Sequence, residues 1–256
     1  MFTRFLEYIG AGVLEMLYFV GDITIFFWQT LQQLPKRLRI RHILHQMSHL
    51  GVDSLPIVSM TLLFTGMVMT LQMAGEMIKF GAESTVGGVV AIAIGRELGP
   101  VLVGVVAAGR VGSAMTAEIS TMKVTEQIDA LRVMATNPLG YLVVPRMLAC
   151  MVMVPLLTVY GDFIGVAGGW LVAEKYFSIP GHVYWDSILR FADGADFYAG
   201  LVKAVVFGIV IATVGCYYGM RAPAGAEGVG TATTRSVVTA IIVIFLLNVI
   251  LSWMLY

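Results

Sequence analysis

Three stretches of this sequence carry no charged residue over a length close to the thickness of a lipid bilayer: 54–75, 204–220 and 236–256. A helix needs about 20 mainly apolar residues to cross the hydrocarbon core, and the shorter middle stretch still falls within the usual range. Composition agrees, because 58% of the residues are hydrophobic and 12% are charged, far from the balance of a soluble domain. The sequence therefore predicts an all-α integral membrane protein.

Two further spans are predicted only if charge inside the membrane is tolerated. One is interrupted by Arg96 and Glu97, and the other by Asp162. We therefore expect five transmembrane helices in a single domain, at 54–79, 84–109, 146–174, 204–220 and 236–256. The remaining segments are an N-terminal helix with a basic connector (1–50), a region at 113–137, an outer segment at 175–203 and a flexible inner loop at 221–235.

The basic residues predict how these helices are oriented, because Lys and Arg accumulate in short cytoplasmic loops. An inner N-terminus places eleven basic residues inside: Arg4, Lys36, Arg37, Arg39, Arg41, Arg110, Lys123, Arg132, Arg146, Arg221 and Arg235. It places four outside: Lys79, Lys175, Arg190 and Lys203. We therefore expect a cytoplasmic N-terminus and a C-terminus on the outer side.

The N-terminal segment 2–34 is apolar but carries Arg4, Glu7, Glu15 and Asp22. At about 100° per residue these four side chains share an arc of roughly 80°, which gives the helix one polar face. This pattern is typical of an amphipathic helix lying in the plane of the headgroups. A signal peptide is the alternative, but acidic residues interrupt its apolar core and no small-residue cleavage site follows.

Three histidines follow in "KRLRIRHILHQMSH", where His42, His45 and His49 share one helical face. This spacing is compatible with a metal site. However, no carboxylate or cysteine completes such a site in the sequence, so we predict none. The basic composition favours contact with anionic lipid headgroups instead.

The region 113–137 contains the sequence "TEQIDALRVMATNP". Thr125 is placed to cap a short helix, Glu126 and Asp129 suit its first turn, and Asn137 followed by proline ends it. An apolar stripe is formed by Ile128, Leu131 and Met134. Such a helix either docks into the groove of another protein or lies on the membrane surface.

The sequence contains no nucleotide-binding motif. The nearest approach, "GVVAAGRV" at 104–111, has the glycine spacing of a phosphate-binding loop but lacks the Lys-Ser/Thr that follows it. An ATP-driven function would therefore need a separate ATPase subunit. An intramembrane enzyme is also disfavoured, because no histidine falls in any predicted span to serve as a base.

Arg96 and Glu97 are the most unusual residues of the predicted spans. A charge in hydrocarbon costs several kcal/mol, so such residues normally face a cavity, a partner charge or a polar ligand. Pro100 removes the amide that would bond the Arg96 carbonyl, which predicts a kink beside the charges. Two interpretations remain open: an internal salt bridge between Arg96 and Asp162, or contact with a polar ligand.

Two other patterns lie inside the predicted spans. Small residues recur every four positions at Gly95 and Gly99, at Gly161, Gly165 and Gly169, and at Gly215 and Gly219. Such faces allow close helix packing, either within one subunit or between subunits. A stripe of Met69, Met73 and Met77 followed by Phe80 suits a surface that holds acyl chains, although ordinary core packing gives the same spacing.

Taken together, three stretches resemble the MlaE/YrbE family of ABC-transporter permeases: "RELGPVLVGVVAAGRVGSAMTAEISTMKVTEQIDAL", "NPLGYLVVPRMLA" and "ATTRSVV". The resemblance implies a homodimeric permease of the bacterial inner membrane. Its partners would be a cytoplasmic ATPase, which binds ATP and Mg²⁺, a periplasmic MCE-domain lipid-binding protein and a small cytoplasmic accessory subunit. The family moves phospholipids between the inner membrane and periplasmic carriers, which maintains outer-membrane lipid asymmetry.

By this resemblance, the helix at 125–134 is the coupling helix, with Thr125, Glu126, Ile128, Asp129 and Leu131 as ATPase contacts. Arg96 and Glu97 are then expected to line a lipid site whose apolar wall is formed by Met69, Met73, Met77 and Phe80. No catalytic residue and no cofactor is expected in this chain. The alternative is a proton-coupled secondary transporter that uses Arg96, Glu97 and Asp162 as a relay.

Overall fold

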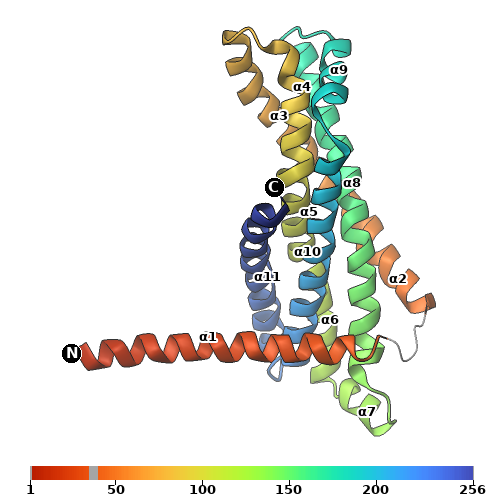
Figure 1. Ribbon diagram of the computed structural model, residues 1–256. Helices are drawn as coiled ribbons and strands as arrows, with labels where there is room; N and C mark the ends of the chain where they lie inside the picture. The colour runs from red at the N-terminus through yellow and green to blue at the C-terminus, as the bar shows by residue number, and fades with distance from the viewer. Residues whose placement is uncertain (1, 35–39, 256) are drawn as a thin grey trace.

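The computed structural model describes residues 2–34 and 40–255, and within these ranges it contains helices and no strand. Five helical runs are long and apolar enough to cross a membrane: Ile40–Lys79, Glu83–Val124, Leu139–Lys175, Gly194–Met220 and Ala226–Leu255. They stand side by side as an elongated bundle (Figure 1). The all-α membrane fold with five spans predicted from hydropathy is therefore confirmed.

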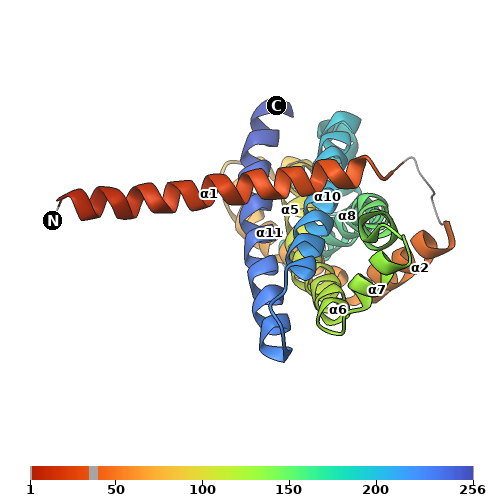
Figure 2. The same ribbon diagram turned by 90° about the horizontal axis from the view of Figure 1, so that it is seen from below.

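The N-terminal helix α1 (Phe2–Leu31) crosses one end of this bundle at a steep angle (Figures 1 and 2). It is held there by Phe19 and Phe26, whose rings pack edge-on against Tyr217 of α10 (Gly194–Met220). Asp22 adds a 3.2 Å ion pair with Arg221. An amphipathic helix in the membrane plane would have this placement. The side chains of Arg4 and Glu7, and the basic connector at 35–39, lie outside the described residues.

The first run consists of α2 (Ile40–Gly51), a single 3₁₀ turn and α3 (Leu55–Lys79). Pro56 stands in the first turn of α3, where a missing amide donor is tolerated. The second run consists of α4 (Val86–Ala93), α5 (Gly99–Ala107) and α6 (Ser113–Val124). Two π-helical turns join these three helices, at Ile94–Leu98 and Ala108–Gly112.

The second run is longer than the 84–109 expected, because no proline or turn signal interrupts 113–124 and the helix continues to Val124. The coupling region thus contains most of α6 and then a short helix, α7 (Gln127–Val133). The expected capping by Thr125 is wrong: its hydroxyl donates back to the Thr121 carbonyl at 2.8 Å. Glu126 precedes α7 in a left-handed conformation, with φ of 59°, which turns the chain sharply between the two helices.

The third run enters through a π-helical turn (Leu139–Val143) and continues as α8 (Val144–Lys175). The outer segment expected at 175–203 is mostly helical, with α9 (Gly181–Phe191) and the first turns of α10 (Gly194–Met220). The loop expected at 221–235 is also shorter, because α11 (Ala226–Leu255) begins directly after Gly225. The Gly and Ala residues from Ala226 onward belong to the first turns of α11 and do not form a flexible connector.

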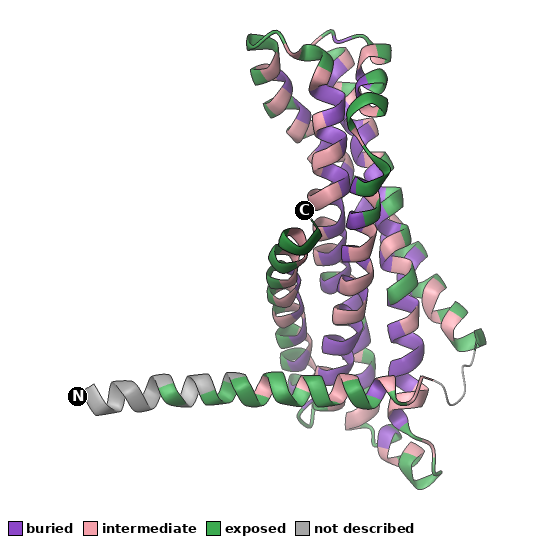
Figure 3. Cartoon of the chain, in the orientation of Figure 1, coloured by how far each residue is buried: buried purple, intermediate pink, exposed green. Residues whose placement is uncertain are grey.

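The core of the bundle lies where α5, α8 and α10 meet, whereas α11 and α1 are largely exposed (Figure 3). The glycine faces pack within the subunit. A Cβ on Gly66 of α3 would collide with the backbone carbonyl of Gly165 on α8, and Gly215 and Gly219 face α6. The small residues therefore bring neighbouring spans of one chain into backbone contact.

Candidate functional site

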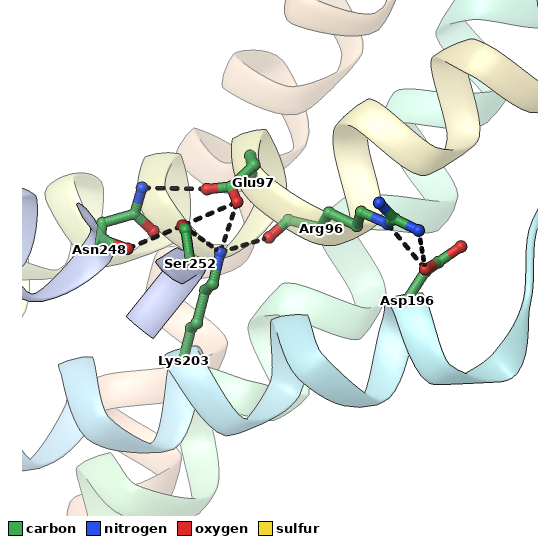
Figure 4. A network of polar contacts seen from close by, with 6 residues as sticks. All are labelled: Arg96, Glu97, Asp196, Lys203, Asn248 and Ser252. Atoms are coloured by element: carbon green, nitrogen blue, oxygen red, sulfur yellow. Dashed lines mark hydrogen bonds and ion pairs between the residues drawn. The ribbon is translucent and has the colours of Figure 1, made fainter. Parts of the chain in front are cut away.

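Arg96 and Glu97 lie on the π-helical turn between α4 and α5, and their side chains take different partners (Figure 4). Successive residues point about 100° apart on a helix, so adjacent charges cannot share one partner. Glu97 faces α10 and α11, whereas Arg96 faces the first turn of α10. The turn thus places two charges in two separate sites.

Glu97 accepts hydrogen bonds from three side chains on two other spans. Lys203 Nζ on α10 lies 2.6 Å from Glu97 Oε1, and Ser252 Oγ on α11 lies 2.8 Å from the same oxygen. Asn248 Nδ2 donates to Oε2 at 3.0 Å. Lys203 is fully buried and also donates to the Arg96 carbonyl at 3.1 Å and to Ser252 at 2.9 Å. The ammonium therefore has three acceptors inside the bundle, which offset the cost of its burial.

Arg96 forms its ion pair with Asp196 in the first turn of α10. Its Nε lies 2.7 Å and its Nη2 2.6 Å from Asp196 Oδ1. The second oxygen of Asp196 accepts a hydrogen bond from the backbone amide of Asp193, so the same carboxylate closes the capping box that begins α10. The position of this helix start and the orientation of Arg96 are thereby linked.

Of the two interpretations left open for Arg96, the salt bridge with Asp162 is not formed, because Arg96 pairs with Asp196. Asp162 on α8 is 7% exposed and forms no hydrogen bond or ion pair with any residue in the described ranges. Its Oδ1 is packed against Gly99 instead. Arg96, Glu97 and Asp162 therefore do not form one connected relay.

Sequence reasoning missed Lys203 and Asp196 because both were assigned to an outer segment and counted as solvent-facing. They are in fact seven positions apart on one helix, which places them two turns apart on the same face. That pair of opposite charges on one face of an apolar helix, beside the adjacent opposite charges Arg96 and Glu97 on a neighbouring span, is the signal that could have found them. Asn248 and Ser252 are uncharged polar residues four positions apart on α11, which also places them on one face of their helix.

A cavity of about 380 Å³ lies beside α3, with Leu98, the residue that follows Glu97 in the chain, on one wall and Phe64, Thr65, Val68, Met69 and Gln72 on the other. Met69 lines it directly. Met77 packs against the core and receives a contact from the Thr85 hydroxyl, and Phe80 is 81% exposed at the end of α3. Met73 is half-buried. The structure thus places one residue of the methionine stripe in the cavity; contact of all four side chains with lipid stays a prediction.

The short helix α7 projects from the end of the bundle near α1 (Figure 1). Ile128 is buried in a cluster with Ile119, Leu142 and Cys216, and Leu131 packs beside it. Asp129 is held between Lys123 and Arg132 at 3.2 and 3.0 Å. Glu126, Val133 and Met134 are exposed. One face of α7 therefore anchors it to the bundle and the other is available to a partner.

No group of three or more His, Cys, Asp or Glu residues is arranged to hold a metal ion among the residues described. His42, His45 and His49 lie on α2, where His49 is 4.0 Å from Asp53. His42 packs against the ring of Tyr141, with 5.6 Å between ring centroids.

Residues 43–254 match the protein family described as Permease MlaE. A probable ABC transporter permease protein of Synechocystis sp. is 46% identical over 87% of this chain and 85% of its own length. One from Rickettsia typhi is 39% identical over 100% of this chain and 99% of its own. Protein TRIGALACTOSYLDIACYLGLYCEROL 1, chloroplastic, from Arabidopsis thaliana is 36% identical over 87% of this chain and 63% of its own length.

These matches cover all five spans and the polar network between them. The relatives are named for the membrane subunit of a transporter, and ATP hydrolysis belongs to another subunit. The chain therefore belongs to the MlaE permease family and is the non-catalytic, multi-pass permease subunit of an ABC transporter.

Proposed function

We propose that this permease moves phospholipid between the bacterial inner membrane and periplasmic carriers, and so maintains outer-membrane lipid asymmetry. The observation that carries the proposal is the Glu97 network on the π-helical turn whose next residue, Leu98, lines a cavity together with Met69. A phospholipid has a charged head and apolar tails, so its site needs a few polar groups next to an adaptable apolar wall. The name of the Arabidopsis relative, which contains a glycolipid name, is in keeping with a lipid substrate.

The permease acts as a homodimer in this proposal, and the cavity at α3 faces the second subunit. α3 carries an exposed apolar row that includes Ile57, Met60, Phe64 and Val68. A second copy on this row would enclose the open side of the cavity, where Phe64, Val68 and Leu98 lie. The periplasmic MCE-domain protein would receive lipid at the α9 end of the bundle, where the C-terminal side of α3 leads.

The ATPase docks at the opposite end, on the exposed face of α7. Val133 and Met134 are 88% and 66% exposed there, and Glu126 at the start of α7 is also exposed. Because Ile128 anchors α7 to α6 and α10, a displacement of α7 by the ATPase is transmitted to the helices that carry Glu97 and Lys203. This arrangement puts α1 and α7 in or beside the cytoplasm and the C-terminus toward the periplasm. A small cytoplasmic accessory subunit would bind at this end as well.

Proton-coupled secondary transport would need Arg96, Glu97 and Asp162 to exchange a proton. Arg96 and Glu97 already have charged partners, Asp196 and Lys203, and Asp162 contacts neither of them. The geometry therefore favours an ATP-driven transporter over a proton-coupled one.

The test is to purify Glu97→Ala with its native partner subunits and to quantify co-purified phospholipid by mass spectrometry. Glu83→Ala is the matched control, because Glu83 is an exposed glutamate at the end of the bundle, away from the network. We expect Glu97→Ala to lose most of the bound lipid and the control to keep it. Undiminished lipid in Glu97→Ala, with an intact outer-membrane barrier in cells, would contradict the proposal.

A further inference from the structure

A cavity of about 520 Å³ lies between α2, α6 and the start of α8, at the end of the bundle that carries α1 and α7. Its polar lining comes from Arg41, His42 and His45 on α2, Glu118 on α6 and Arg146 on α8. A second cavity of about 370 Å³ continues from it along His45 and Glu118. Basic side chains from separate helices thus converge on one hollow, far along the bundle from Glu97.

Arg146 forms the floor of this cavity and is only 4% exposed. Its Nη2 pairs with Glu118 Oε2 at 2.8 Å, and its Nη1 donates to the Leu142 carbonyl at 2.8 Å. Its Nε is buried and donates to no acceptor among the described residues. A buried donor without an acceptor is costly, so a ligand that accepts a hydrogen bond from this edge of the guanidinium would be stabilised.

The charge balance of the cavity favours an anion. Glu118 is the single carboxylate among the residues that line the larger cavity, all of which are described, and it is already paired with Arg146. Arg41 therefore contributes a positive charge that no lining carboxylate offsets. His42 and His45 add ring nitrogens that can donate hydrogen bonds to an anion. Arginine is well suited to bind phosphate because its planar guanidinium matches two phosphate oxygens.

The surroundings of the cavity indicate that the phosphate belongs to a lipid. α2 presents Ile40 and Leu44 outward, 68% and 58% exposed, and it leads directly into the spanning helix α3. A short helix with one apolar exposed face beside a span lies at the level of the headgroups. Leu142 and Pro145 supply apolar lining next to Arg146. A free phosphate ion would make no contact with either apolar surface, whereas the glycerol backbone and acyl chains of a lipid would pack against them.

We infer that this cavity binds the phosphate headgroup of an anionic phospholipid in the leaflet at the α7 end of the bundle. This lipid is distinct from the one held beside Glu97. The inference depends on the proposed function only for naming this leaflet cytoplasmic. Basic pockets between helices on the cytoplasmic side are a known means of selecting anionic lipids. A lipid bound here would brace α2 against α6, next to the helix that leads to α7.

The test uses the full chain, purified with the subunits that accompany it, and native mass spectrometry with added phosphatidylglycerol or phosphatidylethanolamine. The variant Arg41→Gln/His45→Gln removes one exposed cationic side chain and one exposed imidazole donor and leaves the Arg146–Glu118 pair intact. Arg235→Gln, an exposed arginine on α11, is the matched control. We expect the double variant to bind phosphatidylglycerol at least about fivefold more weakly, the factor expected for one basic residue near an anionic surface.

Equal retention of phosphatidylglycerol by the double variant and the control would overturn the inference, provided that both keep the melting temperature of the parent protein. Displacement of the lipid by millimolar glycerol 1-phosphate would assign the site to a soluble phosphate ligand and would also overturn it. A photo-crosslinking residue at Gln46, which lines both cavities, should capture phosphatidylglycerol. Glu97→Ala should leave this capture unchanged, so failure here is distinguishable from failure at the Glu97 site.

Discussion

Lys203 and Glu97 stand 106 positions apart in the sequence, yet 2.6 Å separates Lys203 Nζ from Glu97 Oε1 in the bundle. Ser252, near the end of α11, bonds to both side chains. The contact therefore ties three spans together at one level of the membrane. It also neutralises the two charges, which is the condition for keeping either of them there.

Removing one partner of this contact should destabilise the protein. Lys203→Met leaves Glu97 without its ammonium, and loss of one partner of a buried pair costs about 3–5 kcal/mol. We expect the lower end of that range, because the Glu97 side chain is 38% exposed. Thermal unfolding of the purified protein in detergent measures the effect. Lys79→Met, which removes a lysine with an exposed ion pair at the end of α3, should change the melting temperature little.

Glu97→Gln combined with Lys203→Met should recover part of that stability, because neither charge is then left uncompensated. The double variant unfolds at a higher temperature than Lys203→Met alone if the pair is coupled. Additive losses would show that the two side chains act independently.

Asp162 should respond in the opposite direction. Its carboxyl group is buried and has no partner among the described residues, so it must either bury a charge or take up a proton, and the isosteric amide in Asp162→Asn avoids both costs. We expect an equal or higher melting temperature for Asp162→Asn, in contrast to the loss for Lys203→Met. A clear decrease would indicate that the carboxylate makes an essential contact.

The close approach of α3 and α8 predicts that Gly66→Ala disrupts the bundle. A Cβ at this position would collide with the Gly165 carbonyl, and backbone atoms cannot rotate away. The control is Gly75→Ala on the same helix, where a Cβ meets open space. We expect a loss of a few kcal/mol for Gly66→Ala, as for other overpacked sites, and no loss for the control. Yield and melting temperature in detergent report both.

The exposed face of α7 should determine binding of the ATPase. Val133→Ser changes a side chain that is 88% exposed, so it should leave the fold intact and weaken co-purification of the ATPase. Ile128→Ala instead empties a buried position and should cost about 2–5 kcal/mol of stability. If Val133→Ser retains the full amount of ATPase in a pull-down, the contact lies elsewhere on the chain.

Hydropathy was sufficient to predict the five spans, since apolar length dominates the free energy of membrane insertion. The ends of the helices were less predictable. α10 begins at Gly194 because Asp193 and Asp196 form a capping box, and that short-range motif lies outside the apolar stretch that marked the span. α6 extends to Val124 because nothing in 113–124 breaks a helix.

The candidate site was predicted in part. Arg96 and Glu97 were recognised because charge within a span is rare, but their partners depend on how the spans are arranged around each other. Asp162 was the candidate partner for Arg96 because it interrupts a predicted span, whereas Asp196 lies in the segment assigned to the outer side. Only the packing of Gly99 against Asp162, and of the first turn of α10 against Arg96, separates the two.

The π-helical turn Ile94–Leu98 has one more consequence for this family. A π turn contains one residue more than an α turn, so α4 and α5 are two rods with different angular registers along one span. If a single helical wheel is drawn across residues 86–107, it will place the residues of either α4 or α5 on the wrong face of the helix. Deletion of a single residue within the turn would restore a regular helix and rotate all of α4, with α9 packed on it, relative to the rest of the bundle. When sequences of this family are compared, a one-residue gap at this position should therefore be taken to mean that the half of the span containing α4 faces a different direction.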